Sequence, residues 1–110
     1  MFKSSLTVVS ASIMLAFASM APAHAAVDAD AAQALFKKNN CGTCHAPDKT
    51  KAGPSLKAMA ADQKGKADAQ DKVIKQITTS AKLKQGGEHK VIDTKDPKEL
   101  KNLADWILAQ

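Results

Sequence analysis

Cys41-Gly42-Thr43-Cys44-His45 is the stretch that decides how this chain folds. A C-x-x-C-H sequence is the attachment site of a covalently bound c-type haem. In such a site the two thiols add across the two vinyl groups of the porphyrin, and the histidine becomes the proximal ligand of the iron. The motif therefore predicts one haem c, bound through Cys41 and Cys44 and ligated by His45. It leaves open what binds the opposite face of the iron.

The N-terminus has the pattern of an export signal, as covalent haem attachment outside the cytoplasm requires. Lys3 precedes an apolar run over residues 6–17, and Ala23-His24-Ala25 has the small-x-small pattern of a signal-peptidase site. We expect cleavage after Ala25, with Ala26 as the alternative.

A retained membrane anchor is the other interpretation of this segment. Its apolar run is shorter than the about 20 residues that a membrane-spanning helix needs, and no later stretch could span a bilayer. We therefore expect residues 1–25 to be a signal peptide and residues 26–110 to form one mature, periplasmic domain. We expect no stable membrane insertion of that domain after cleavage.

The mature domain is small and poor in aromatic residues. Its 85 residues retain only Phe36 and Trp106, and both cysteines of the chain belong to the haem motif, so no disulfide is available. A bound porphyrin would supply the missing apolar core and a covalent cross-link. The mature chain has 15 lysines against 11 acidic residues, a net charge of +4, or about +2 with two haem propionates. This mildly basic balance does not indicate nucleic-acid binding.

The spacing of apolar residues predicts an all-α domain. We expect helices over residues 30–38, 55–61, 69–81 and from 96 to near the C-terminus, with a long loop over 82–95. No segment alternates between apolar and polar residues as a β-strand would, and there is no internal repeat.

Residues that cap helices mark three of the predicted helix starts. Asp30 is expected to cap the first helix, and Ser55 the second. Asp96 is expected to cap the last helix, with Pro97 in the first turn and Glu99 completing a capping box.

From about residue 30 to residue 110, the chain resembles a small bacterial class I cytochrome c of the short periplasmic, monohaem kind. The similar parts are, in order, Ala34-Leu35-Phe36, the haem motif, Gly53-Pro54 and Leu103-Ala104-Asp105-Trp106-Ile107-Leu108. The resemblance implies a cytochrome c domain over 26–110, with three to four helices around one covalent haem. It also implies that the first and last helices cross closely, through Ala32, Phe36, Leu103 and Trp106.

The resemblance also gives Gly53-Pro54 a role in cofactor binding. In the family, the proline carbonyl accepts a hydrogen bond from the proximal imidazole, which here implies a bond from His45 to Pro54. Such a bond orients the ring and raises its basicity. An ordinary turn is the alternative, since Gly-Pro is common in loops.

The chain departs from the family at the distal ligand of the iron, which is usually a methionine. Met59 is the only methionine left after cleavage, and it follows Gly53-Pro54, which the family places on the proximal side. We expect Met59 to be a core residue. His89 lies 44 residues beyond His45, in the loop where the family's methionine would fall, and is our preferred sixth ligand.

Two alternatives to His89 stay open. Lys90 could bind the iron only after losing a proton, against a reference pKa of about 10.4. An iron with no strong distal ligand would be open to small gases. Imidazole in place of thioether favours ferric iron, so ligation by His89 predicts a lower reduction potential than that of methionine-ligated relatives.

The resemblance and the motif together predict a one-electron carrier that is monomeric and not an enzyme, because no nucleophile, base and orienting group occur together. A lysine rim near the haem would steer acidic redox partners, the alternative being a simply solvated surface. Its members are Lys49, Lys51, Lys57, Lys82, Lys84 and Lys90. The competing functions are a gas-binding or sensing protein with an open sixth site and, much less favoured, a thiol redox pair or half a zinc site at Cys41 and Cys44.

Overall fold

Four α-helices and one 3-10 turn make up the computed structural model, which describes residues 26–110. Their order is α1 (Ala29–Lys38), η1 (Cys41–Thr43), α2 (Leu56–Gln63), α3 (Ala69–Thr78) and α4 (Pro97–Leu108). Within residues 26–110, β structure is limited to two isolated bridges, His45 to Thr50 and Lys82 to Glu88. The all-α prediction is confirmed, while the predicted signal peptide lies outside the described residues.

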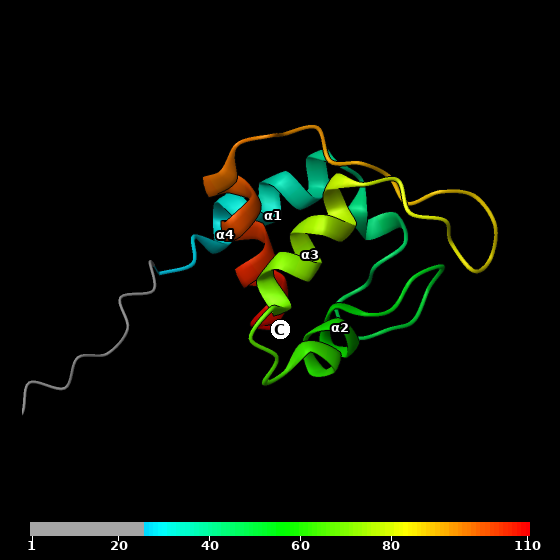
Figure 1. The fold of residues 1–110 in the computed structure, drawn as a ribbon, viewed down its shortest axis with the longest axis horizontal. Helices are drawn as coiled ribbons and strands as arrows, with labels where there is room; N and C mark the ends of the chain where they lie inside the picture. The colour runs from blue at the N-terminus through cyan, green and yellow to red at the C-terminus, as the bar shows by residue number, and fades with distance from the viewer. Residues whose placement is uncertain (1–25) are drawn as a thin grey trace, which may run out of the picture.

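Helix α4 is the centre of the packing, since it contacts α1, α2 and α3 (Figure 1). Its buried side chains belong to one hydrophobic cluster that also draws on α1, α2 and the loop before α4. The cluster consists of Ala32, Leu56, Ile92, Leu100, Leu103 and Ile107. Apolar residues of α3, such as Val73 and Ile77, pack against it but remain only partly buried.

The predicted crossing of the first and last helices is confirmed. Ala32 on α1 is 1% exposed, and Leu103 and Ala104 on α4 are 1% and 0% exposed. Next to them, the rings of Phe36 and Trp106 meet edge to face, with centroids 5.5 Å apart and planes inclined by 64°. The only Phe and Trp side chains of residues 26–110 thus meet at one helix contact.

The predicted capping residue is wrong for α1 and confirmed for α2. The side chain of Asp28, not Asp30, caps α1 by accepting a hydrogen bond from Ala31 N–H at 3.0 Å. The prediction of Asp30 as the cap is therefore wrong, and Asp30 lies in the first turn. Ser55 caps α2 as predicted, through a 3.0 Å bond from Ala58 N–H to its hydroxyl.

For α4, the prediction of Asp96 as the cap is confirmed, but the predicted capping box with Glu99 is wrong. Asp96 Oδ1 accepts a hydrogen bond from Lys98 N–H at 2.9 Å, with Pro97 in the first turn. Glu99 does not close a capping box, because its carboxylate accepts a hydrogen bond from the hydroxyl of Thr94. That same hydroxyl oxygen accepts the Asp96 N–H at 3.2 Å, where the box would have placed the Glu99 side chain.

Helix α3 ends three residues earlier than predicted. The hydroxyls of Thr78 and Thr79 donate to the carbonyls of Ile74 and Lys75, at 2.7 and 2.6 Å. Such local side-chain bonds compete with continuation of a helix. The chain then leaves α3 as a long loop over residues 79–96.

Two loops extend on the same side of the helices (Figure 1). They are the 46–55 loop, which follows the haem motif, and the 79–96 loop, which carries His89. A hydrogen bond of 2.8 Å from Gln85 Nε2 to the Ala52 carbonyl joins them. This bond joins residues that are 33 positions apart in the sequence. The segments that carry the two predicted iron ligands, His45 and His89, are therefore neighbours in space.

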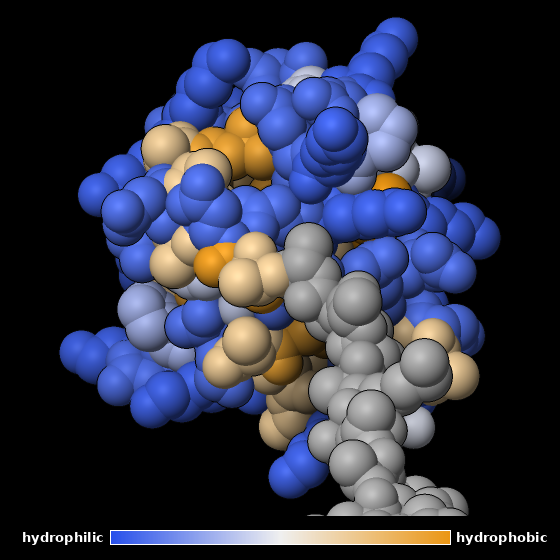
Figure 2. Space-filling view, turned by 90° about the vertical axis from the view of Figure 1, so that its left-hand side faces the viewer, coloured by the Kyte–Doolittle hydropathy of each residue, from blue (hydrophilic) through white to orange (hydrophobic). Residues whose placement is uncertain are grey.

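Figure 2 shows the face opposite these loops, where small apolar areas are separated by hydrophilic side chains. Among the described residues, the only large hydrophobic side chains classed as exposed are Val27 and Val91. No helix within residues 26–110 is long and apolar enough to cross a membrane.

The helix crossing gives a stability prediction. We expect Leu103→Ala to lower the free energy of unfolding of the haem-bound protein by about 2–5 kcal/mol, because Leu103 is 1% exposed and the surrounding helices cannot close the cavity. Urea unfolding followed by circular dichroism measures the change. Val91→Ala is the matched control, since Val91 is 44% exposed. Equal losses in the two variants would contradict this account of the core.

Candidate haem site

Helix α1 delivers the haem motif, and a sharp turn shapes it. Asn40 adopts the left-handed conformation (φ 55°, ψ 29°), which asparagine tolerates better than most residues. The chain then forms a helical turn in which Cys44 N–H and His45 N–H both donate to the Cys41 carbonyl, at 3.2 and 3.0 Å. Residues three and four apart in such a turn lie on one side. Cys41, Cys44 and His45 are thereby brought together.

The two cysteines are partly buried and not joined to each other. Burial raises the pKa of the Cys41 thiol above its usual value, and this outweighs the opposing effect of the Lys90 charge. Reactive redox cysteines have the opposite property, a lowered pKa. The described residues also contain no group of three or more His, Cys, Asp or Glu side chains placed to hold a metal. Neither a thiol redox pair nor a zinc site is therefore supported.

The proximal histidine is oriented by the 46–55 loop. His45 Nδ1 lies 2.7 Å from the Pro54 carbonyl oxygen, so it is the nitrogen that donates a proton to that carbonyl. His45 Nε2 is then the nitrogen with a lone pair for a metal. The loop itself is held to the motif by hydrogen bonds from Gly53 N–H to the Cys44 carbonyl (3.0 Å) and from Leu56 N–H to the Ala46 carbonyl (2.9 Å).

Gly53 has a role that sequence reasoning did not assign. A Cβ atom at this position would lie 2.5 Å from Cε1 and 2.9 Å from Nδ1 of His45. Any side chain would therefore push the imidazole away. The requirement here is space against the ring, since the backbone conformation of Gly53 is not one that excludes other residues.

The structure places His89 close to His45, on the neighbouring loop. The ring centroids are 6.2 Å apart and the ring planes are inclined by 42°. His89 Nδ1 lies 2.9 Å from the Lys90 carbonyl oxygen, and its backbone N–H donates to the Ala81 carbonyl at 2.7 Å. As in His45, Nδ1 is occupied by a carbonyl, which in the neutral ring leaves Nε2 free to bind a metal.

This separation fits one metal ion between two imidazoles. Two metal–nitrogen bonds of about 2 Å each, and roughly 1 Å more from each nitrogen to its ring centre, give about 6 Å between ring centres. Ordinary aromatic neighbours also occur at such distances. The matching Nδ1–carbonyl bonds distinguish the present pair, because each leaves the metal-binding nitrogen unprotonated.

The other two candidate ligands are engaged elsewhere. Met59, on α2, packs against the hydrophobic cluster. The Lys90 ammonium donates a 3.0 Å hydrogen bond to the Asn39 carbonyl. Of the candidates for the sixth position among the described residues, His89 is the one whose ring lies next to that of His45, with the centroids 6.2 Å apart.

Asn39 forms a buried polar network that sequence reasoning missed entirely. It is 3% exposed, and its side chain bonds both the carboxylate and the backbone N–H of Asp93, at 3.1 and 3.0 Å. The hydrogen bond from Asn39 holds the pKa of the Asp93 carboxyl below its usual value, and the nearby Lys38 ammonium adds to this effect. Asn39 and Asp93 are 54 residues apart and belong to none of the motifs identified in the sequence, so no local pattern predicts the network.

Two surface hollows lie beside the helices. One, of about 480 Å³, is lined mostly by apolar area and includes Met59, Val73 and Ala81, the residue whose carbonyl binds the His89 N–H. Its lining also includes the charged side chains Asp62, Lys72 and Lys75 but no cysteine or histidine, so it does not include the haem motif.

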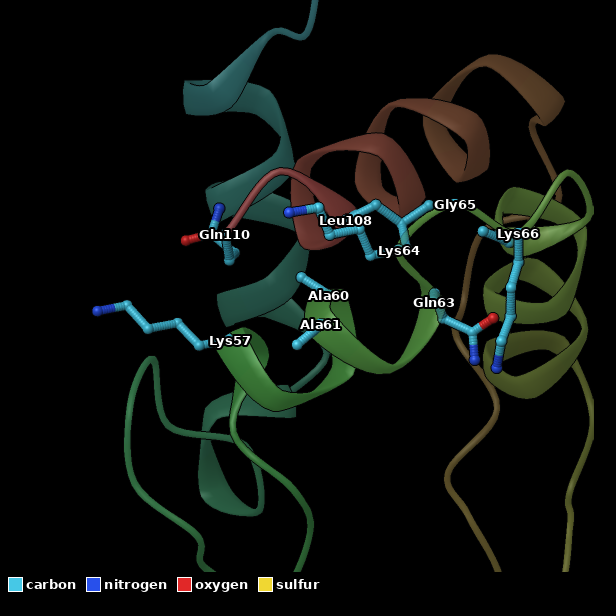
Figure 3. Close-up of a pocket in the computed structure, with 10 residues that line it drawn as sticks. Lys57, Ala60, Ala61, Gln63, Lys64, Gly65, Lys66, Leu108 and Gln110 are labelled. Atoms are coloured by element: carbon cyan, nitrogen blue, oxygen red, sulfur yellow. The ribbon is translucent and has the colours of Figure 1, made fainter.

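The other hollow, of about 540 Å³, lies between α2, the turn that follows it and the end of α4 (Figure 3). In Figure 3, Gln63 and Lys66 lie side by side at one end, and Lys57 points away at the other. None of its lining residues is a cysteine or histidine, so it is separate from the haem motif.

Comparisons with known proteins identify the family to which this chain belongs. The family model described as cytochrome c matches residues 29–110. Cytochrome c-551 of Azotobacter vinelandii is 35% identical over 80 residues, which cover 67% of this chain and 90% of that protein. Cytochrome c-551 of Pseudomonas denitrificans is 32% identical over 74 residues, with the same two coverages.

Solved structures give the same result. The class 1 cytochrome MtoD from Sideroxydans lithotrophicus ES-1 is 49% identical, with a TM-score of 0.69, and the match covers 76% of this chain and 97% of that one. Nitrosomonas europaea cytochrome c552 is 34% identical, with a TM-score of 0.58 and coverages of 69% and 95%. The chain belongs to the cytochrome c family, has that family's covalently bound haem c, and is a monohaem electron carrier with redox proteins as partners.

The space at Gly53 gives a prediction. We expect Gly53→Ala to push the His45 ring off the Pro54 carbonyl, because the new Cβ would lie 2.5 Å from Cε1. Loss of such a supporting bond weakens metal binding by about 10- to 100-fold. The low-spin ferric absorption spectrum should therefore be lost at a higher pH during acid titration than in the wild type.

Gly42→Ala is the matched control for this substitution. Gly42 lies inside the haem motif, but a Cβ there would make only an ordinary 3.5 Å contact with Phe36. We expect its acid titration to follow that of the wild type. Identical titrations of wild type and Gly53→Ala would show that the close approach of Gly53 to His45 is unimportant.

Proposed function

We propose that this cytochrome c carries single electrons between proteins of the periplasm, through a haem whose iron is ligated by His45 and His89. Cys41 and Cys44 form the two thioether links, and the segment before residue 26 is a signal peptide that is removed after export. The observation that supports His89 most strongly is the pair of neighbouring imidazoles, with ring centroids 6.2 Å apart and each Nδ1 bonded to a backbone carbonyl.

The bound haem supplies the one-electron couple of its iron, and the protein sets how easily that couple is reduced. Both histidines donate Nδ1–H to a carbonyl, of Pro54 and of Lys90. Such bonds raise the basicity of the coordinating nitrogen, which favours ferric iron. Through these two bonds the protein would lower the reduction potential of the iron from both of its ligands.

Exchange of the distal ligand tests the proposal. We expect His89→Met to raise the reduction potential on the order of 100 mV, part of the about 0.8 V range that axial ligands cover, because a thioether stabilises ferrous iron. Spectroelectrochemical titration measures it. Met59→Leu is the control and should leave both the potential and the ferric spectrum unchanged, since Met59 packs in the core. A His89→Ala protein with the ferric EPR spectrum of the wild type would refute ligation by His89.

The alternative function is a gas-binding or sensing protein with an open or labile sixth site. It rests on the lack of a methionine in the 79–96 loop. Rapid binding of carbon monoxide by the reduced wild type would support that alternative, whereas a stable six-coordinate spectrum in both oxidation states supports the electron carrier.

The lysines around the two loops suggest how acidic partners are attracted. Lys49, Lys82 and Lys84 are exposed on these loops, while the ammonium groups of Lys51 and Lys90 are bonded to backbone carbonyls at the motif. Exposed charges of this kind accelerate encounter with an oppositely charged protein. We expect the mature protein to act as a monomer that meets such partners transiently.

This steering has a measurable dependence on salt. We expect the rate of electron transfer to an acidic redox protein to fall about tenfold or more as ionic strength rises. Lys82→Ala/Lys84→Ala should reduce that dependence, because both lysines lie on the 79–96 loop. The control is Lys98→Ala/Lys101→Ala, with the same loss of charge in the first half of α4, on the opposite side of the molecule (Figure 1). Stopped-flow rates that ignore ionic strength would exclude steering.

A further inference from the structure

We propose that Asn39 is a positioning residue that holds His89 at the haem iron, by tying the 79–96 loop directly to the haem-attachment peptide. This inference rests on the proposed ligation by His89. Asn39 is the C-cap of α1 and precedes Cys41 by two residues. It is 3% exposed, one of only two polar residues buried among those the structure describes.

The side chain of Asn39 makes more hydrogen bonds than a helix end requires. Its Nδ2 donates to the Leu35 carbonyl at 3.0 Å, which satisfies a carbonyl at the end of α1. The same nitrogen donates to Asp93 Oδ1 at 3.1 Å, and Oδ1 accepts the Asp93 N–H at 3.0 Å. Two of these three bonds therefore reach across 54 residues to the loop that carries His89.

The backbone of Asn39 adds a further link to that loop. Its carbonyl accepts a 3.0 Å hydrogen bond from the ammonium of Lys90, the residue next to His89. Asn39 therefore bonds the side chain of Lys90 as well as the backbone and side chain of Asp93. These contacts lie one and four residues after His89, so they attach the chain next to His89 to the end of α1.

For the position of His89 at the iron, it matters to which part of the protein the 79–96 loop is attached. The same segment is also held to α3, since Ile92 is 8% exposed and its N–H donates to the Ile77 carbonyl at 2.8 Å. The haem, however, is bonded to the peptide that follows Asn39, at Cys41 and Cys44. The distance from His89 to the iron would depend on where the loop lies relative to that peptide. Asn39 joins the two before the motif, and the Gln85–Ala52 bond joins them after it.

Departure of His89 from the iron requires the loop to swing away, which strains or breaks these buried bonds. An unpaired buried polar group is costly, so the bonds oppose opening. Asn39 thus keeps the iron six-coordinate without touching it. A purely structural role for Asn39 would predict lower stability on substitution but no change in ligand exchange.

The test measures how fast His89 leaves the iron. The ferric holoprotein is mixed with imidazole in a stopped-flow instrument at concentrations that saturate the rate, so that loss of the native distal ligand is limiting. We expect Asn39→Ala to raise this limiting rate by about 10- to 100-fold over the wild type. The ferric spectrum before mixing should still be six-coordinate and low-spin.

Asn102→Ala is the matched control. Asn102 also joins two distant segments, because its side chain accepts the Asp28 N–H at 2.8 Å and donates to the Asp28 carbonyl at 2.9 Å. Those bonds hold the N-terminal segment to α4 and do not involve the 79–96 loop. We expect a similar loss of stability in urea but an unchanged rate of imidazole binding.

Asp93→Ala gives a second, milder test for the case that Asn39→Ala does not assemble with haem. It removes the bond to Asp93 Oδ1 and the exposed 3.3 Å ion pair between Lys38 and Asp93, but keeps the bond from the backbone N–H. The Asp93 side chain is 48% exposed, so the variant should fold. We expect a smaller acceleration than for Asn39→Ala. A limiting rate for the Asn39 or Asp93 variant no greater than that of Asn102→Ala would overturn the role of Asn39. A failure of the proposed ligation would look different, since His89→Ala would then keep the wild-type ferric spectrum.

Discussion

The packing of α1 against α4 is the constraint on which the rest of the structure depends. Ala32 on α1 and Ala104 on α4 are 1% and 0% exposed, and such small side chains allow helices to approach closely. The neighbouring Phe36 and Trp106 rings lock the same pair of helices one turn further along α1. Because α1 ends only three residues before Cys41, the crossing also fixes where the haem motif begins. A domain without a disulfide and with two aromatic rings has little else to set that position.

Different contacts orient and locate the two histidines, His45 and His89. His45 is oriented by a carbonyl nine residues away, so its ring depends on how the 46–55 loop folds back on the motif. His89 is oriented by the carbonyl of the adjacent residue, so its ring orientation is local to its own stretch of chain. This local bond sets the direction of the His89 ring but not where His89 lies in the molecule. Its position is determined by the contacts of the segment that follows it, with Ile77 on α3 and with Asn39 at the end of α1.

The sequence was sufficient for features whose cause lies within a few residues or in a specific motif. These include the haem motif, the Ser55 and Asp96 caps and the stripe of α4 that contains Leu103. The sequence was not sufficient where several nearby residues are equally suited to a role and a distant partner determines which of them takes it. Asp28 and Asp30 are equally suited to cap α1, and the one selected is the residue whose backbone is held by Asn102, 74 positions away. The Asn39 network is of the same kind, since its partner Asp93 is 54 positions away and neither residue belongs to a motif.

An electron carrier and a gas sensor place opposite demands on the sixth ligand. A sensor needs a ligand that leaves, whereas a carrier transfers electrons fastest when the coordination of the iron is the same before and after. A loop held only by its own turns would open readily, because long loops have few contacts that resist motion. The 79–96 loop is instead bonded to Ala52, Asn39 and Ile77, and two of these three contacts are with the peptide around the haem motif. Thermal motion of the loop relative to the core would then carry the attachment peptide with it. For an iron between His45 and His89, this arrangement conserves the distance between the ligands while the rest of the molecule moves, which is the behaviour that an electron carrier requires.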